Sequence, residues 1–76
     1  MPTLKRFPNC RIEVRFGDHN PPHFHVVFND GREVLMEIAN MDIMLGHARR
    51  SELASVVGWA MENRTLLNAA WKECNP

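Results

Sequence analysis

Three stretches in the first half of the chain alternate apolar and polar residues with the period of two that is typical of β-strands. They are residues 11–16, 23–28 and 33–38, and in each of them the even-numbered residues are apolar. Asn29-Asp30-Gly31 predicts a tight hairpin connection between the second and third stretches, because Gly31 can adopt the left-handed conformation. Antiparallel pairing without a net slip then places all three apolar sets on one face of a three-stranded meander.

The opposite face of this predicted sheet is polar. It carries two charged or imidazole side chains from each strand: Glu13, Arg15, His23, His25, Glu33 and Glu37. The residues best suited to chemistry therefore gather on the face that the apolar core does not use.

In the second half of the chain, apolar residues recur with the period of about 3.6 residues that indicates amphipathic helices. Residues 39–48 come first and are interpreted as a connector, in which Ile43 or Leu45 contacts the core and Gly46 forms a turn. Ser51 and Asn63 are the predicted N-caps of two helices, the second of which ends at Asn75-Pro76. The two apolar stripes are Leu53, Val56, Val57, Ala60 and Met61, and then Leu66, Leu67, Ala70, Trp71 and Cys74.

These elements predict an α+β fold of the order βββαα in a single domain, residues 1–76, with both helices packed on one face of the antiparallel meander. Trp71 lies within the second stripe and is expected in the core. Trp59 lies beside the first stripe, and we expect it to widen the buried face of that helix.

Composition and charge narrow the class of protein. Apolar residues make up 45% of the chain and nine Lys+Arg balance nine Asp+Glu, which favours a globular fold without the overall basic charge of a dedicated nucleic-acid-binding protein. No apolar run reaches the roughly 18 residues that a membrane span requires, and no signal segment is recognised, so we expect a cytoplasmic protein that does not enter the membrane. Cys10 and Cys74 are expected to be reduced, buried thiols, because their spacing fits neither a redox pair nor a zinc finger.

Asp18, His19, His23 and His25 form a segment with the composition of a metal site. His23 and His25 project from the same face of a strand about 7 Å apart. Two such imidazoles, with a third from the adjoining turn, can bind Zn²⁺, Mn²⁺ or another divalent ion. Asp18 or Glu37 is the predicted carboxylate ligand. His47 has no companion at ligand spacing and is expected to be solvated or to act as a cap.

The same segment is also compatible with catalysis without a metal. Imidazoles titrate near neutral pH, so His23 and His25 suit general acid–base chemistry, and Arg15 would hold an anionic substrate. A purely structural interpretation stays open beside these two. Pro21-Pro22 stiffens the approach to the strand, and imidazoles often serve as hydrogen-bonding surface groups.

A third use of this region is contact with a partner protein or with RNA or DNA. Local positive charge near the start of the chain and before the first helix favours it, although the neutral chain as a whole does not. The candidate contact residues are Arg15, His19, His23, His25, Arg49 and Arg50.

Several features of the sequence also occur in a group of small bacterial and archaeal proteins. They are Met1-Pro2-Thr3, Phe7, a strand ending at Phe16, the segment Asp18-His19-Asn20-Pro21-Pro22-His23-Phe24-His25-Val26, and Gly46 before two helices that contain Trp59 and Trp71. On these residues, which span nearly the whole chain, the sequence resembles the domain-of-unknown-function 4160 family, whose most specific motif is D-H-x-P-P-H-F-H-V. It departs from the family at His47-Ala48, where members often have Lys-Pro.

The resemblance supports the fold and implies a genetic context. Members of the family are often encoded beside a second small protein, in a pair that looks like a toxin–antitoxin module. The resemblance therefore implies a partner protein encoded nearby. It leaves the chemistry of the histidine segment open, because the family carries no established activity.

Three hypotheses for the function follow. The first is a small interaction protein of a toxin–antitoxin-like gene pair, which binds its partner through the histidine face of the sheet or through exposed helix faces; a homodimer is also compatible with the sequence. The second is an RNA-cleaving enzyme, metal-dependent or not, that uses Asp18, His23 and His25 with help from His19 and Arg15. The third is a nucleic-acid-binding module, which is disfavoured because neither helix resembles a basic recognition helix.

Overall fold

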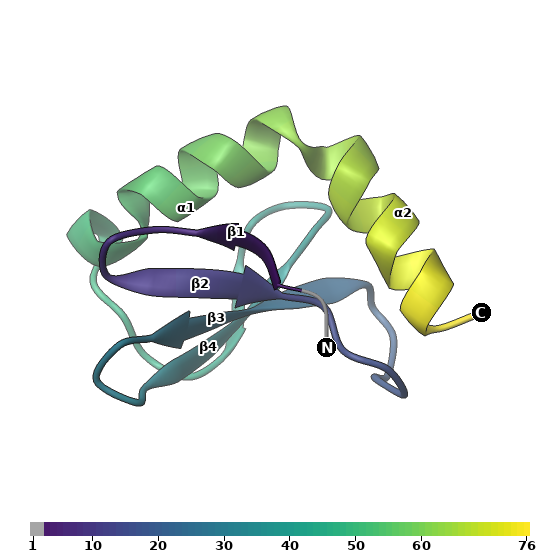
Figure 1. Cartoon of the computed structure of the whole chain (residues 1–76), viewed down its shortest axis with the longest axis horizontal. Helices are drawn as coiled ribbons and strands as arrows, with labels where there is room; N and C mark the ends of the chain where they lie inside the picture. The colour runs from purple at the N-terminus through teal and green to yellow at the C-terminus, as the bar shows by residue number, and fades with distance from the viewer. Residues whose placement is uncertain (1–2) are drawn as a thin grey trace.

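Five β-strands and two α-helices form the fold of residues 3–76, the part of the chain that the computed structural model describes (Figure 1). In chain order they are β1 (Thr3–Arg6), β2 (Cys10–Glu13), β3 (His23–Phe28), β4 (Glu33–Glu37), β5 (Ile43–Leu45), α1 (Arg50–Glu62) and α2 (Arg64–Cys74). Met1 and Pro2, which contribute to the family resemblance, lie outside the described residues. The predicted α+β class with two C-terminal helices is confirmed.

The strands form one antiparallel sheet in which neighbours in sequence are neighbours in space. Ile12 pairs with Val26, and Val26 pairs with Val34, so the even-numbered apolar residues share one face as predicted. These three side chains are completely buried because both helices lie on that side of the sheet (Figure 1). Burial of each large apolar side chain stabilises the fold by about 1.5–3 kcal/mol. The core between sheet and helices therefore fixes which residues remain on the opposite, polar face.

The sheet has an additional strand at each edge, so the prediction of only three strands was wrong. In β1 the half-buried Thr3 and Leu4 are followed by the exposed Lys5 and Arg6, which gives no alternation. β5 lies within the segment that was interpreted as a connector, and all of its residues are exposed. Each edge strand is held by backbone hydrogen bonds to one neighbouring strand. This pairing does not require apolar and polar side chains to alternate along the strand.

The predicted contact of Ile43 or Leu45 with the core was also wrong. Their exposed fractions are 42% and 65%, and Met41 and Ala48 pack against the core instead. Gly46 makes the expected turn with a φ of 92°. A Cβ atom at Gly46 would overlap the backbone of β4, so glycine lets the end of β5 lie close to its neighbour.

β2 ends at Glu13, before the predicted end of the strand at Phe16. Val14 is still buried, but Phe16 is 65% exposed instead of facing the core. The chain leaves the sheet after Glu13 and turns at Gly17, which has a φ of 74°. Alternation therefore no longer decides which side chains are buried there. The loop of residues 14–22 that results carries Asp18 to the polar face of the sheet.

α1 begins at Arg50, and its N-cap is Arg49 in place of the predicted Ser51. The backbone amide of Arg49 donates a hydrogen bond to Glu52 Oε1 (2.9 Å), which is half of a capping box and starts the helix earlier. Asn63 occupies the N-cap position of α2 as predicted, but its side chain donates to the Trp59 carbonyl oxygen (2.8 Å) and makes no capping hydrogen bond to α2. No helix within residues 3–76 has the length and apolar character needed to cross a membrane.

The apolar stripes of the two helices are buried except near the junction of the helices. Met61 and Leu66 are 56% and 47% exposed, so their assignment to the core was wrong. They flank the junction between α1 and α2, which lies farther from the sheet than the rest of either helix (Figure 1). The remaining core predictions are confirmed: Trp59 packs against the core, and Trp71, Cys10 and Cys74 are buried, both cysteines as free thiols.

Candidate metal centre

The loop between β2 and β3 is fastened to the C-terminal end of α2. The backbone amide of Asp18 donates a hydrogen bond to Asn75 Oδ1 (2.7 Å), and Asn75 Nδ2 donates one to the Arg15 carbonyl oxygen (3.1 Å). Each such hydrogen bond stabilises the fold by about 1 kcal/mol. In Figure 1 the end of α2 lies beside this loop. A single asparagine side chain thus fixes the loop at the point from which Asp18 reaches the sheet.

His23 and His25 lie on β3, on the face of the sheet opposite the apolar side chains of Ile12, Val26 and Val34. Residues two apart on a strand project from the same face, and the two ring centroids are 5.3 Å apart. Their exposed fractions are only 4% and 5%, although the apolar residues Ile12, Val26 and Val34 lie on the other face of the sheet. Side chains of the loop, of β4 and of α2 surround them. The histidine pair is therefore largely shielded from bulk water.

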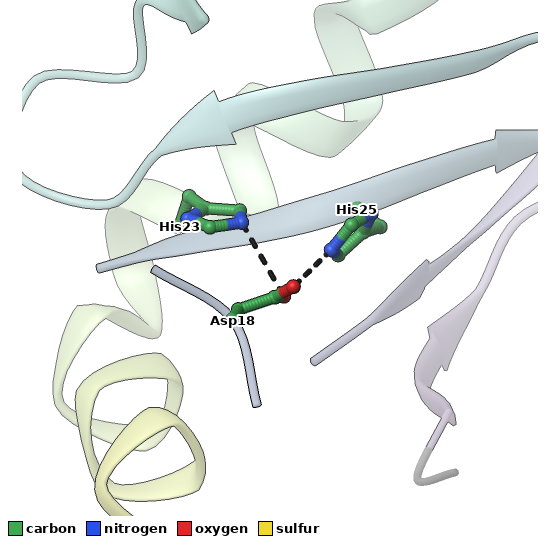
Figure 2. Close-up of side chains that lie close together, drawn as sticks. All are labelled: Asp18, His23 and His25. Atoms are coloured by element: carbon green, nitrogen blue, oxygen red, sulfur yellow. Dashed lines mark hydrogen bonds and ion pairs between the residues drawn. The ribbon is translucent and has the colours of Figure 1, made fainter. Parts of the chain in front are cut away.

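The carboxylate of Asp18 contacts both imidazoles (Figure 2). Asp18 Oδ2 lies 2.8 Å from His25 Nε2 and 3.3 Å from His23 Nε2. One potential ligand atom from each of these residues lies within 4.8 Å of the other two. Ligand atoms about 2.0–2.1 Å from a tetrahedral Zn²⁺ ion are about 3.4 Å from one another. The three side chains therefore have both the donor types and nearly the spacing of a metal-binding set.

The other nitrogen of each ring has an acceptor of its own. His23 Nδ1 lies 2.9 Å from the Pro21 carbonyl oxygen, and His25 Nδ1 lies 2.7 Å from Glu33 Oε1. A carbonyl oxygen and an ionised carboxylate only accept hydrogen bonds, so we infer that each Nδ1 carries a proton. In neutral rings both Nε2 atoms then direct lone pairs toward Asp18 Oδ2. Three acceptors that face one another require positive charge between them, supplied either by protons on the rings or by a metal ion.

α2 supplies one wall of the site. The Trp71 ring, which is buried, lies 5.0 Å from the His23 ring between centroids, with an angle of 51° between the planes. A cavity reaches Asp18 between the loop and the end of α2. It is lined by Gly17, Asp18 and Asn20 from the loop and by Trp71, Cys74 and Asn75 from the helix end. This cavity gives a small molecule or ion a route to the carboxylate.

A chain of alternating charges runs from His25 along the polar face. Arg15 Nη1 lies 2.6 Å from Glu33 Oε1, and Arg15 Nη2 lies 3.2 Å from Glu13 Oε1. Glu13 Oε2 in turn lies 2.6 Å from Arg11 Nε. The hydrogen bond from Arg11, together with Arg15, holds the pKa of Glu13 below its ordinary value despite burial. Burial alone would raise the pKa of Glu33, but hydrogen bonds from His25 and Arg15 lower it. Glu33 is therefore ionised near neutral pH and can accept the His25 Nδ1–H.

The structure brings together three of the four residues predicted as metal ligands, namely Asp18, His23 and His25. Of the two predicted carboxylates, Asp18 is the one in the group. His19 is exposed and lies outside it. Glu37 pairs with His23 across the strands but is also outside the group found within residues 3–76.

The predicted arginines occupy two different places. Arg15 lies beside the histidines, where its guanidinium contacts Glu13 and Glu33. These contacts favour a role for Arg15 in holding Glu33, which in turn contacts His25. Its participation in catalysis or substrate binding stays a prediction. Arg49 and Arg50 lie at the start of α1 and are not part of the histidine group.

Two supporting residues, Glu33 and Asn75, were not assigned to the site from the sequence, although Glu33 was placed on the same face of the sheet. His25 pairs with Leu35 across β3 and β4, and Glu33 follows two residues away on the same face as a diagonal neighbour. Applying the diagonal-neighbour rule to the predicted meander would have identified Glu33. Asn75 contacts Asp18 across 57 positions of sequence, and no local pattern indicates such a contact.

Comparison with known proteins places the chain in a family. Residues 11–72 match the family model described as Domain of unknown function (DUF4160), and the chain belongs to this family. The match covers β3, β4, β5 and α1 completely and includes Asp18, His23 and His25. Searches of curated proteins and of solved structures gave no significant match.

The lowered pKa of Glu13 predicts a specific acid sensitivity. Because the folded-state pKa lies below the ordinary value of 4.5, the ionised carboxylate stabilises the fold above that value, and this stabilisation is lost as the pH falls through the folded-state pKa. Urea unfolding of wild type and Glu13→Gln at a series of pH values would measure the effect. The free energy of unfolding of wild type should fall more steeply with decreasing pH than that of the variant, and parallel curves would contradict the prediction.

Proposed function

We propose that the protein is a metal-dependent hydrolase, in which Asp18, His23 and His25 bind one divalent ion, Zn²⁺ or Mn²⁺, that activates water to cleave phosphodiester bonds of RNA. The observation that carries this proposal is the orientation of the two rings. Each Nδ1 has a hydrogen-bond acceptor, and both Nε2 atoms turn toward one carboxylate oxygen. Metal-binding histidines commonly donate their other ring N–H to a carboxylate or a carbonyl oxygen in this way.

The number of ligands supports a catalytic site over a structural one. Structural zinc sites are closed by four protein ligands, whereas catalytic sites use three and leave a position for water. The group within residues 3–76 supplies three, Asp18, His23 and His25. A Zn²⁺ ion held by three protein ligands can lower the pKa of a bound water to about 7, which makes hydroxide available near neutral pH. The cavity beside Asp18 would admit that water.

The charge balance around the site supports both the ion and an anionic substrate. The carboxylates of Asp18, Glu13 and Glu33 outnumber the guanidinium groups of Arg11 and Arg15 by one in this contact network. Without an ion the network has one negative charge when the imidazoles are neutral, which attracts a cation. A divalent ion reverses the sign, and the resulting positive charge would attract a phosphodiester.

Metal affinity tests the ligand set. In isothermal titration of metal-stripped protein with Zn²⁺ and with Mn²⁺, we expect one site per chain. Asp18→Asn and His25→Ala should weaken binding more than 100-fold, and Glu33→Gln should weaken it about 10-fold because it only orients His25. The matched histidine controls, His19→Ala and His47→Ala, should bind like wild type.

The same preparations, checked for folding by circular dichroism, should then be assayed for cleavage of an unstructured RNA oligonucleotide.

Cleavage should require the metal and disappear in Asp18→Asn and His23→Ala. A wild-type protein that takes up no metal would contradict the whole proposal. Metal uptake by a protein that leaves RNA intact would retain the site and reject the RNA-cleaving activity.

Binding of a partner protein is the second candidate function. The observation that favours it is the set of uncovered apolar side chains of β5, which a small domain rarely leaves exposed without a role. We propose that the partner is the product of a neighbouring gene in a toxin–antitoxin-like pair. The two purified proteins should then elute together in size-exclusion chromatography, and elution at the volumes of the separate proteins would contradict this proposal.

A further inference from the structure

Most of the exposed large apolar side chains gather in one region. Within residues 3–76 they are Phe16, Ile43, Met44, Leu45, Met61 and Leu66. Three of the six make up the whole of β5, and their exposed fractions are 42%, 38% and 65% in chain order. A fourth, Met61, lines a groove together with Ile43. This concentration sets β5 and the groove beside it apart from the rest of the surface.

The groove lies between α1 and the segment that leads into β5. Its apolar lining is rich in methionine, a flexible side chain that adapts to the shape of a bound group. The large apolar lining residues are Met36, Met41, Ile43, Leu53, Val57 and Met61. Leu53 and Met36 are buried and connect the groove to the core. An apolar side chain placed in this groove would therefore contact the core directly.

β5 also offers backbone groups for pairing. It is the last strand in the sheet order and pairs only with β4, through Leu35 with Leu45 and Met36 with Ile43. Its outer edge has no neighbouring strand within residues 3–76. Proteins usually protect such an edge with lysine, proline or covering elements, and β5 contains neither of these residues. An extended segment can add to an edge of this kind by main-chain hydrogen bonds.

Charge at the groove indicates what kind of segment fits. Arg50 and Arg64 line it, with Asp42 as the single acidic residue. None of the ion pairs found within residues 3–76 involves either arginine. Arg64 Nε donates to the Ile38 carbonyl oxygen (3.0 Å), which leaves its terminal nitrogens for other acceptors. The excess of positive charge favours carboxylates on the bound segment and disfavours a second copy of the chain, which would bring more arginines.

We propose that β5 and this groove bind an extended, acidic segment of a partner protein. The segment adds a strand to β5, places an apolar side chain between Ile43 and Met61, and directs a carboxylate toward Arg50 or Arg64. This proposal rests on the second candidate function and is independent of the metal centre. It names the binding surface on this protein and the chemistry of the bound segment, and it holds whichever partner protein contains that segment.

A random peptide library displayed on phage tests the proposal directly. Peptides selected on wild type, with counter-selection on Ile43→Lys, should combine apolar residues at alternate positions with Asp or Glu. A synthetic copy of an enriched peptide should bind Ile43→Lys at least 10-fold more weakly, because a lysine blocks the edge and the groove. Arg50→Gln should weaken binding about 3-fold or more. Leu66→Lys, which changes an exposed leucine that does not line the groove, should bind like wild type.

Four outcomes would overturn the proposal. One is the absence of any peptide whose binding depends on Ile43, and another is enrichment of basic peptides. The third is a wild-type dimer in sedimentation experiments that Ile43→Lys converts to a monomer, because the occupant would then be a second copy. If the neighbouring gene product binds wild type and Ile43→Lys equally, the partner function stands and this surface is wrong.

Discussion

The contact of the Asp18 carboxylate with His23 and His25 joins the separate parts of this small protein. Asp18 belongs to the loop after β2, the imidazoles belong to β3, and the end of α2 holds the loop through Asn75. Trp71 of the same helix packs against the His23 ring. Loop, sheet and helix thus meet at one carboxylate. A loss of that contact would affect both the position of the loop and the shape of the cavity beside it.

The polar face of the sheet is organised to support these side chains. Glu33 accepts the Nδ1 proton of His25, Arg15 holds Glu33, and Glu13 holds Arg15. Buried charges are costly unless each is paired and hydrogen-bonded. Glu13 is buried and Arg15 and Glu33 are partly buried, and within residues 3–76 no buried side-chain nitrogen or oxygen lacks a hydrogen-bond partner. Because Glu33 contacts His25 Nδ1 directly, we infer that the network also orients the histidine ring.

The sequence was most informative where alternation and core burial coincide. The shared parity of Ile12, Val26 and Val34 determined which residues form the apolar face of the sheet, and hence that His23 and His25 lie on its opposite face. The edge strands were missed because backbone pairing there imposes no side-chain pattern. The grouping of Asp18 with the histidines was anticipated from their proximity in sequence.

Neither the contact of Asn75 with the loop nor the exposure of Phe16 could be predicted from the sequence pattern. Asn75 acts on the loop from the far end of the chain, and no periodicity connects the two. Phe16 is exposed because β2 ends early and the chain turns at Gly17. The alternation of apolar and polar residues does not show where the strand ends. The family membership confirmed the resemblance and adds no activity.

The most direct test of the account is nitrogen-15 NMR of the imidazole rings of His23 and His25, recorded on metal-stripped protein and during titration with Zn²⁺. If Asp18, His23 and His25 bind the ion, both rings in the loaded protein should carry a proton on Nδ1 and show the shift of a metal-bound Nε2, while His19 and His47 keep their resonances. Rings that remain unchanged on addition of Zn²⁺, with both nitrogens protonated, would show that protons supply the positive charge beside Asp18 and would contradict the metal centre.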